Sequence, residues 1–294
     1  MSVPFGQEAI LKYWGKADPA YPHEQKWHPL AYHSLDVAAV ATSWWNASPA
    51  IQRTFLTAFN CTQLQQSQLR AWVLFFTALH DLGKFDVRFQ LKAPDALAAA
   101  WRPLGKEDHG VPPSEINKFD HGHAGMAWAN QEYRIWLGHS DADRAVWEKW
   151  KPWLAAVTGH HGDFYEPTRI CEPEADTSII EHDRTARHAF VSVLADIFLT
   201  PEGLGFRDMP PLASLSAQSL LAGFCAVCDW IGSNTDVCAY QKPDAALTDY
   251  LKARIAKIQT DDVLRRFGLF ATAGEYKNVN ALLKPEESPR GVQV

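Results

Sequence analysis

The sequence predicts an all-α domain, and three observations support this fold class. Apolar residues recur three and four positions apart along most of the 294 residues, which is the spacing of one helix face. Runs of alternating β-branched residues, which would indicate strands, are scarce. Hydrophobic residues make up 47% and charged residues 21% of the chain, a globular composition that excludes a disordered or collagen-like protein.

The expected helices follow from this spacing and from residues that begin or end helices. Ser34 is the predicted N-cap of an Ala-rich helix over 34–46. The amphipathic segment 64–80 should end near Gly83, because glycine is favoured just past a helix end. Further helices are predicted over residues 121–136, 152–160, 181–199, 216–231 and 244–267.

The spacing of proline and glycine predicts how these helices are connected. Residues 94–118 and 162–177 should be long loops, and long loops in a compact helical domain tend to flank functional sites. We find no internal repeat, and the tail KPEESPRGVQV is typical of a linker. We therefore expect one domain over residues 1–283, followed by a linker over 284–294.

The charge balance restricts the kind of partner. Lysine and arginine number 28 against 34 aspartates and glutamates, which gives a net charge of −6. Attraction of the whole molecule to nucleic acid is therefore excluded as the main source of binding, and any such contact must be local. No window approaches the ~18 uninterrupted apolar residues of a membrane span, and the N-terminus lacks a secretion signal. We expect a cytoplasmic protein with no membrane partner.

The densest chemical signal is the segment His80-Asp81-Leu82-Gly83-Lys84, where the amphipathic helix should end. An imidazole nitrogen and a carboxylate oxygen are suitable ligands for a divalent cation. Neighbouring helical positions point ~100° apart, so His80 and Asp81 can converge on one ion only near a helix end. An isolated His-Asp pair is more often a surface dipeptide, and a metal site therefore requires further ligands.

Five further candidates share a setting at helix ends or within apolar helical stretches. One of them, Asp229, falls in an apolar helix, where a buried carboxylate is costly unless it is paired or bound to a cation. Each histidine alone has an ordinary structural explanation, but together with His80 and Asp81 the set predicts a metal centre. The five are His33, His121, His160, His161 and Asp229.

The order and spacing of these motifs resemble the HD superfamily of metal-dependent phosphohydrolases. More narrowly, they resemble the HD nuclease domain of the CRISPR-associated helicase-nucleases of type I systems, particularly subtype I-E. The resemblance implies an HD-superfamily helical domain with a metal site between helices, and it extends over essentially the whole chain. The motifs that carry it are Tyr13-Trp14-Gly15-Lys16, Tyr32-His33-Ser34-Leu35-Asp36, Ala78-Leu79-His80-Asp81-Leu82-Gly83-Lys84-Phe85, Val157-Thr158-Gly159-His160-His161-Gly162 and Asp229-Trp230-Ile231-Gly232-Ser233.

The resemblance implies a site for two divalent metal ions with the carboxylate of Asp81 between them. Imidazole-rich ligation favours Mn, Fe, Co or Ni over a purely Mg site. His123 has no counterpart in the family motif, so we assign the ligand to His121, which holds the His position of His-Gly-x-x-Gly. The implied metal ligands are His33, His80, Asp81, His121, His160, His161 and Asp229.

Two basic residues are the candidate contacts for substrate. Lys84 is placed to contact a substrate phosphate, and Arg88 continues a basic stripe after the His-Asp pair. Together with Asp81, Lys84 is the expected catalytic residue. The alternative is that both side chains are ordinary solvated surface cations. For Lys84, a positive charge would also be favourable at a helix C-terminus.

The implied function is that of a metal-dependent hydrolase, an endo/exonuclease that degrades the invader's displaced single-stranded DNA in type I CRISPR antiviral defence. The implied partners are single-stranded DNA, a helicase domain in cis or in trans, and the type I CRISPR surveillance complex. The chain contains no G-x-x-x-x-G-K-[ST] phosphate loop, so we expect the helicase to lie beyond the 284–294 linker or on another chain.

Two alternative functions remain open at this point. The first is an HD phosphohydrolase acting on nucleotides, which would need base and ribose determinants that the sequence does not reveal. The second is a non-catalytic docking module for a helicase, which would need degenerate metal ligands. All seven predicted ligands are present, and this counts against the second alternative.

Overall fold

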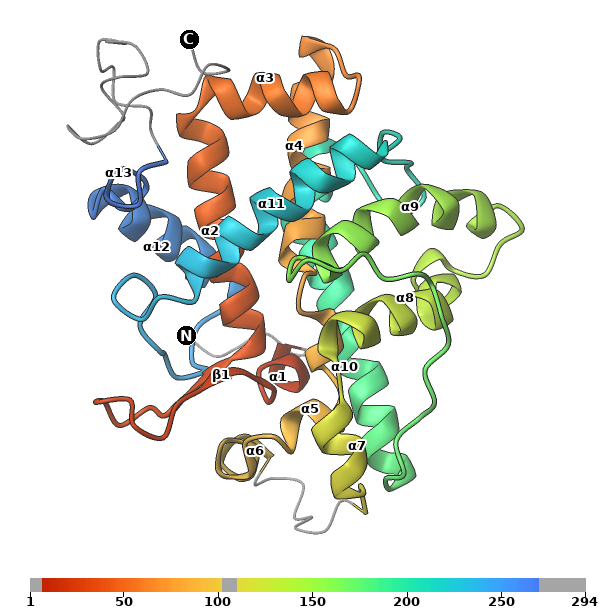
Figure 1. Cartoon of the computed structure of the whole chain (residues 1–294), viewed down its shortest axis with the longest axis vertical. Helices are drawn as coiled ribbons and strands as arrows, with labels where there is room; N and C mark the ends of the chain where they lie inside the picture. Colours follow the sequence, from red (N-terminus) through yellow and green to blue (C-terminus); the bar gives the residue numbers. More distant parts are fainter. Residues whose placement is uncertain (1–6, 102–109, 270–294) are drawn as a thin grey trace, which may run out of the picture.

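Helix α2 (Leu30–Ala47) is the central element of the computed structural model, which describes residues 7–101 and 110–269. Every residue from Leu30 to Ser43 is buried, so this helix has no solvent face along its first three turns. Three helices pack directly against it: α4 (Gln66–Ala78), α11 (Leu215–Gly232) and α12 (Leu247–Thr260) (Figure 1).

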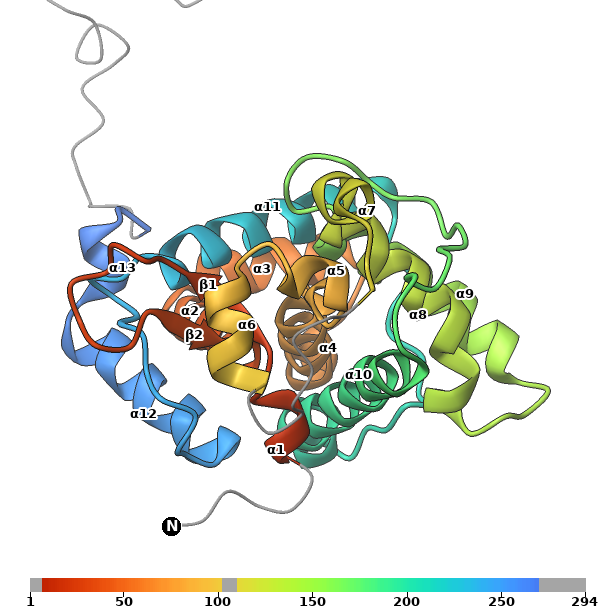
Figure 2. The ribbon, with the colours of Figure 1, turned by 90° about the horizontal axis from the view of Figure 1, so that it is seen from below.

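A second group of helices lies on the side of the molecule opposite α12 (Figure 1). Helices α8 (His121–Leu137) and α9 (Asp143–Thr158) pack against each other, and α9 also contacts α11. Helix α10 (Thr177–Phe198) runs past α4 and contacts the short helix α1 (Gln7–Ile10) (Figure 2). The all-α prediction is confirmed.

A short antiparallel hairpin precedes α2. Its strands are β1 (Trp14–Ala17) and β2 (Trp27–Pro29), with Lys16 opposite His28 and an irregularity between Trp14 and Lys16. The sequence did not predict this hairpin, because two strands of four and three residues are too short to show an alternating pattern.

The predicted helices over 64–80, 121–136, 181–199 and 216–231 are confirmed, with ends that differ by a few residues. The predicted loop over 162–177 is also confirmed, since no helix or strand occurs between α9 and α10. The remaining short elements are η1 (Gln63–Gln65), η2 (Leu82–Lys84), α5 (Val87–Gln90) and η4 (Thr200–Glu202).

Two predicted helix starts are wrong. Helix α2 begins at Leu30 with Pro29 in the N-cap position, and Ser34 lies buried inside the helix, where its hydroxyl is not a cap. Helix α9 begins at Asp143 rather than at Pro152, which lies inside it. A proline within a helix removes one hydrogen bond, and here the burial of Trp150 and its neighbours in the core offsets that cost.

Other boundaries also differ from the prediction. The predicted loop over 94–118 contains α6 (Pro94–Trp101) and α7 (Pro113–Lys118), because proline is tolerated in the first turn of a helix. The segment 244–267 is two helices, α12 and α13 (Val263–Arg266), separated where Asp262 adopts a left-handed conformation with φ 48°.

Helix α3 and the short helices α1 and α5 were not predicted, and one prediction falls outside the described residues. Helix α3 (Pro49–Ala58) begins with Ser48 as its N-cap, whose side chain accepts from the Ile51 amide. The predicted domain end at residue 283 and the linker over 284–294 lie outside the residues that the structure describes.

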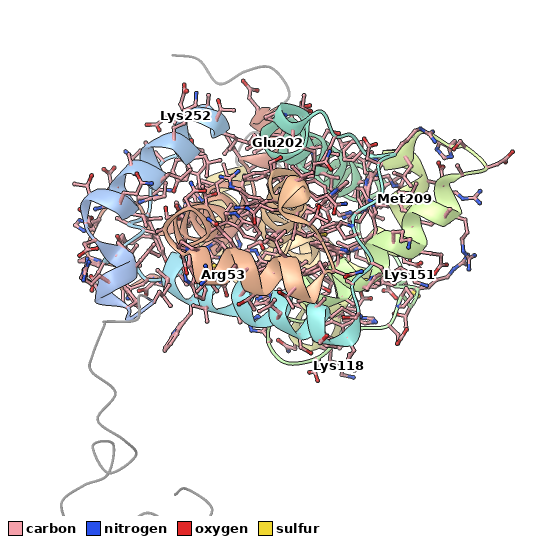
Figure 3. The ribbon with its side chains drawn as sticks, turned by 90° about the horizontal axis from the view of Figure 1, so that it is seen from above. Arg53, Lys118, Lys151, Glu202, Met209 and Lys252 are labelled. Carbon is pink, nitrogen blue, oxygen red and sulfur yellow. The ribbon has the colours of Figure 1, made fainter. Side chains whose placement is uncertain are left out.

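The core is rich in large aromatic side chains, and it also encloses paired charged groups such as Arg187 and Glu132. Trp45, Trp72, Trp150 and Trp153 are among the largest fully buried side chains. Figure 3 shows labelled side chains such as Lys151 and Lys252 on the outer faces, around an interior filled by packed side chains. Helix α11 is long and apolar enough to match a membrane span, but its inner face packs in this core.

Candidate metal centre

The structure brings all seven predicted ligands together at the centre of the fold. They arrive from α2, from the turns after α4 and α9, from the first residue of α8, and from the last turns of α11. Three overlapping groups have ligand atoms within 4.8 Å of one another. These groups are His33, His80 and Asp81; His80, His160 and Asp229; and His121, His160 and His161.

Two of the histidines are oriented by the same kind of hydrogen bond. His80 and His160 each lie two residues beyond the end of a helix, and each ring Nδ1 donates to a carbonyl three residues earlier. The distances are 3.0 Å to Thr77 O and 2.7 Å to Val157 O. Because the last carbonyls of a helix lack intrahelical partners, they fix the imidazole tautomer and leave Nε2 with a free lone pair.

The carboxylate of Asp81 faces two different groups of ligands. Its Oδ2 lies 3.2 Å from His33 Nε2 and 3.3 Å from His80 Nε2. Its Oδ1 lies 3.4 Å from His121 Nε2. Asp81 therefore stands between the His33 and His80 side of the centre and the His121 side.

Asp229 closes the centre from α11. Its Oδ1 lies 3.2 Å from His33 Nε2 and 3.7 Å from His80 Nε2, whereas its Oδ2 lies 3.6 Å from His160 Nε2. The Asp229 side chain is 14% exposed and that of Asp81 is 2% exposed, so the centre is recessed, with Asp229 nearer to solvent.

The unpaired polar atoms at this centre fit a bound cation. Buried nitrogen and oxygen atoms without a hydrogen-bond partner are costly, since they lose the bonds that water would make. Here several such atoms point toward the same small volume, and each is a suitable ligand atom for a divalent ion. They are the Nε2 atoms of His33, His80, His121 and His160.

Burial and neighbouring charges also set the protonation states that metal ligation requires. Burial lowers the pKa of His121 to about 4, and burial together with the His80 ring lowers the pKa of His160 to about 3. Burial alone would raise the pKa of Asp81, but Lys84 and the histidines outweigh it and hold that pKa well below its usual range. At neutral pH His121 and His160 are thus neutral and Asp81 is ionised, as metal ligation requires.

These shifts predict that the metal-free protein loses stability as the pH falls. Below pH 6.5 the unfolded histidines take up protons that folded His121 and His160 do not bind until about pH 4 and about pH 3. The melting temperature in EDTA should therefore drop progressively from about pH 7 to about pH 4, and His160→Gln should flatten this drop. His139→Gln on the exposed α8–α9 turn is the control, and parallel curves for all three proteins would contradict the prediction.

Lys84 and Arg88 have different surroundings. The Lys84 side chain is buried, and its Nζ lies 2.6 Å from Asp81 Oδ2 and 3.3 Å from the Gly15 carbonyl oxygen. The Arg88 guanidinium pairs with Asp86 at 2.7 Å and donates to the Cys171 carbonyl, neither of which belongs to the centre. The structure thus brings Lys84, but not Arg88, to the predicted ligands.

His123 points away from the other histidines. Its Nε2 lies 2.7 Å from the Thr168 hydroxyl, and its ring contacts Tyr165. His121, the first residue of α8, instead lies against Asp81 and His161. A helix separates residues two apart by ~200°, which explains why the two rings diverge.

This divergence predicts a clean difference between two alanine variants. His121→Ala should strongly lower metal content and any metal-dependent cleavage, because it removes a ligand that faces Asp81. His123→Ala should leave metal content unchanged, since its ring is bound to Thr168. Metal analysis of the two variants side by side tests this, and equal losses would show that both rings reach the centre.

Comparison with known proteins agrees with this geometry. Residues 14–238 match the family described as the Cas3 HD domain, a range that contains all seven predicted ligands. The chain belongs to the Cas3 HD domain family. The resemblance expected from the motifs is therefore confirmed.

Two curated relatives bear the name CRISPR-associated endonuclease/helicase Cas3. That of Escherichia coli (strain K12) is 38% identical over 303 residues, which cover 97% of this chain and 33% of the relative. That of Thermus thermophilus is 27% identical over 273 residues, which cover 89% of this chain and 26% of the relative. This Cas3 HD chain thus spans a third or less of the length of these relatives.

A solved structure supports the fold independently. The crystal structure of a CRISPR-associated protein superposes with a TM-score of 0.65 at 23% identity, covering 98% of this chain and 31% of that chain. At this identity the likeness shows the fold alone. The HD helical fold predicted from the sequence is confirmed.

Sequence reasoning assigned no role to one residue of this Cas3 HD domain that reaches the centre. Lys16 on β1 places its Nζ 3.9 Å from Asp229 Oδ1. The segment Tyr13-Trp14-Gly15-Lys16 carried part of the family resemblance, and that was the only signal pointing to it. Nothing in its spacing relates residue 16 to residue 229, because only the fold brings them together.

Proposed function

We propose that this chain is a metal-dependent nuclease domain that binds two divalent ions and hydrolyses phosphodiester bonds of single-stranded DNA. The observation that carries the proposal is the position of Asp81, whose two oxygens face separate groups of histidines. A carboxylate placed in this way fits a bridging ligand. Seven nitrogen- and oxygen-bearing side chains also exceed what a single ion normally takes.

The chemistry divides between the bound ions and the chain. Two divalent ions supply Lewis-acid chemistry, which lowers the pKa of water and neutralises charge on a phosphodiester. The chain itself orients the imidazoles of His80 and His160 through the Thr77 and Val157 carbonyls, and burial keeps the His160 imidazole neutral. It holds Asp81 ionised through Lys84, so the ligand set is complete at neutral pH.

The recessed position of the centre favours a single strand as substrate. Asp81 and His160 are buried, and only His161 in the ligand set is exposed. A flexible strand can enter such a site, whereas a stiff duplex presents its phosphates on a wide cylinder. The net charge of −6 further restricts DNA contacts to local groups near this opening.

The names of the relatives support the wider role. Both are called CRISPR-associated endonuclease/helicase, and both are about three times as long as this chain or longer. We infer that this domain acts with a helicase in cis or in trans. We infer also that a type I CRISPR surveillance complex is its partner, and that its substrate is the displaced strand.

Cleavage assays with matched substrates test the proposal. The purified chain should degrade circular single-stranded DNA with Mn²⁺ or Ni²⁺, leave blunt duplex largely intact, and lose activity in EDTA. It should not respond to ATP, since no phosphate loop of the G-x-x-x-x-G-K-[ST] type occurs in its sequence. Hydrolysis of nucleoside triphosphates without DNA cleavage would favour a nucleotide phosphohydrolase. A lack of both activities with metal bound would favour a docking module.

The stoichiometry of metal binding is a separate prediction. Titration of the metal-free chain with Mn²⁺ should saturate at two ions, because Asp81 offers one oxygen to each side of the centre. Isothermal titration calorimetry and elemental analysis after anaerobic purification measure this number. Saturation at one ion would contradict the two-metal site while leaving a metal-binding fold in place.

A further inference from the structure

Two lysines reach the metal centre, and their surroundings differ. Lys84 is buried and donates to Asp81 Oδ2 and to the Gly15 carbonyl, so protein oxygens already engage its ammonium. The Lys16 side chain is 28% exposed, and its ion pair with Asp229 Oδ1 is a long contact of 3.9 Å. Lys16 thus lies on the solvent side of the centre, next to the most exposed carboxylate of the ligand set.

The backbone that carries Lys16 is held rigidly at this position. Gly15 packs so closely against the start of α2 that an added Cβ would lie 2.9 Å from Leu30 Cα and 3.1 Å from His33 Cβ. Trp14 donates its backbone N–H to Gln90 Oε1 and its indole N–H to Gln90 O, both at 3.0 Å. The strand cannot shift away from His33 without breaking these contacts, so the root of the Lys16 side chain is fixed.

The charge of Lys16 acts on the interior of the centre. Burial is the largest cause of the lowered pKa of His33, and the charge of Lys16 is the second. The same charge also lowers the pKa of Lys84 and of Asp229. The charged and titratable groups facing it are therefore Asp229, His33 and Lys84. A partly exposed ion pair with a separation of 3.9 Å contributes little to folding, which leaves the Lys16 ammonium available to a ligand.

We propose that Lys16 binds a non-bridging phosphate oxygen of the single strand at the entrance to the metal centre. It would contact the substrate from a position nearer to solvent than the buried Lys84. The inference rests on the proposed nuclease function. A compact ammonium with three rotatable donors suits a phosphate that arrives in varying orientations. Its distance from Asp229 places that phosphate next to the ligands rather than at a remote surface.

Three variants test the role of Lys16. Lys16→Ala removes the cation, Lys16→Arg keeps the charge, and Lys26→Ala is the matched control. Lys26 lies in the turn of the same hairpin, is exposed, and donates to the Tyr21 carbonyl rather than to any group of the centre. The hairpin backbone is unchanged in all three, since neither lysine side chain is buried.

The first measurement is binding of labelled oligothymidine to the metal-free chain in EDTA, where no cleavage occurs. Lys16→Ala should weaken binding about tenfold and lower the slope of log affinity against log salt by about 0.7, the value for one phosphate contact on a single strand. Lys16→Arg should restore both values, and Lys26→Ala should match the parent chain. Unchanged affinity and slope in Lys16→Ala would overturn the proposal.

The second measurement separates a substrate contact from an effect on metal. Mn²⁺ titration of Lys16→Ala should give the parental stoichiometry, with affinity equal or higher because a cation beside Asp229 is gone. Under cleavage conditions KM should rise more than kcat falls. A reduced metal stoichiometry would show that Lys16 acts through the metal ligands and would overturn the phosphate contact. If the parent chain cuts no DNA, the nuclease proposal fails, and the EDTA binding experiment still decides the role of Lys16.

Discussion

Replacing Asp81 with asparagine should lower single-stranded DNA cleavage by a factor on the order of 10³ or more. The change removes the charge from a carboxylate whose oxygens face different histidines, with Oδ2 toward His33 and His80 and Oδ1 toward His121. Asparagine keeps the size of the side chain, so the packing around the turn after α4 is retained. The loss should therefore come from the metal centre and not from unfolding.

The experiment needs a readout of folding because Asp81 also pairs with buried Lys84. Breaking a buried ion pair costs about 3–5 kcal/mol when one charge is left alone. We expect a lower melting temperature. The circular dichroism spectrum at room temperature should remain native, because the total stability of a domain is typically about 5–15 kcal/mol. Asp141→Asn on the exposed α8–α9 turn is the matched control and should behave as the parent chain. Parental cleavage by a folded Asp81→Asn variant would remove the active site from this centre.

The histidines at helix ends show what the sequence can predict about this site. His80 and His160 fall where apolar periodicity stops, and both lie just past a helix end. There the unpaired carbonyls of Thr77 and Val157 accept their Nδ1 protons. A histidine just past a helix end can be recognised from neighbouring residues alone, so this part of the site is predictable from the sequence. Residue type and setting suggested that all seven residues form a metal centre, but their arrangement around two ions came from the family resemblance, because no local pattern relates residue 33 to residue 229.

Features that depend on tertiary packing were not predictable in the same way. Helix α2 is buried on all sides from Leu30 onward. No change from polar to apolar residues therefore marks its first residue in the sequence, and Ser34 was wrongly predicted as its N-cap. Helix α9 continues through Pro152 instead of beginning there, because tertiary packing outweighs the hydrogen bond that the proline cannot make. The contact of Lys16 with Asp229 joins a hairpin to a helix more than 200 residues later. Only the fold creates such a contact.

Gly83→Ala should separate the two sides of the metal centre. A Cβ added at Gly83 would lie 1.9 Å from the His121 carbonyl oxygen and 2.5 Å from the Gly125 amide nitrogen. Both atoms belong to the backbone of α8, so no side-chain rotation relieves the collision, and η2 and α8 must move apart. Because His121 is the first residue of α8, this movement withdraws its ring from Asp81 Oδ1.

We expect three consequences of Gly83→Ala, of which the first is a loss of about 1–3 kcal/mol in the free energy of unfolding from overpacking. Mn²⁺ stoichiometry should fall from two ions to one, since His33, His80 and Asp229 do not depend on the position of α8. Cleavage should fall on the order of 10²-fold, the typical cost of a displacement of about 1 Å in an active site.

Gly223→Ala on α11 is the control that gives this experiment its meaning. An added Cβ there meets no atom within 4 Å, so the same chemical change should raise stability by about 0.5–1 kcal/mol through helix propensity. It should leave two Mn²⁺ ions bound and cleavage unchanged. If Gly83→Ala also kept two ions and parental cleavage, α8 would not position His121 through this contact. Opposite shifts in melting temperature, with metal lost in Gly83→Ala alone, would show that the close approach of η2 to α8 holds the second half of the centre in place.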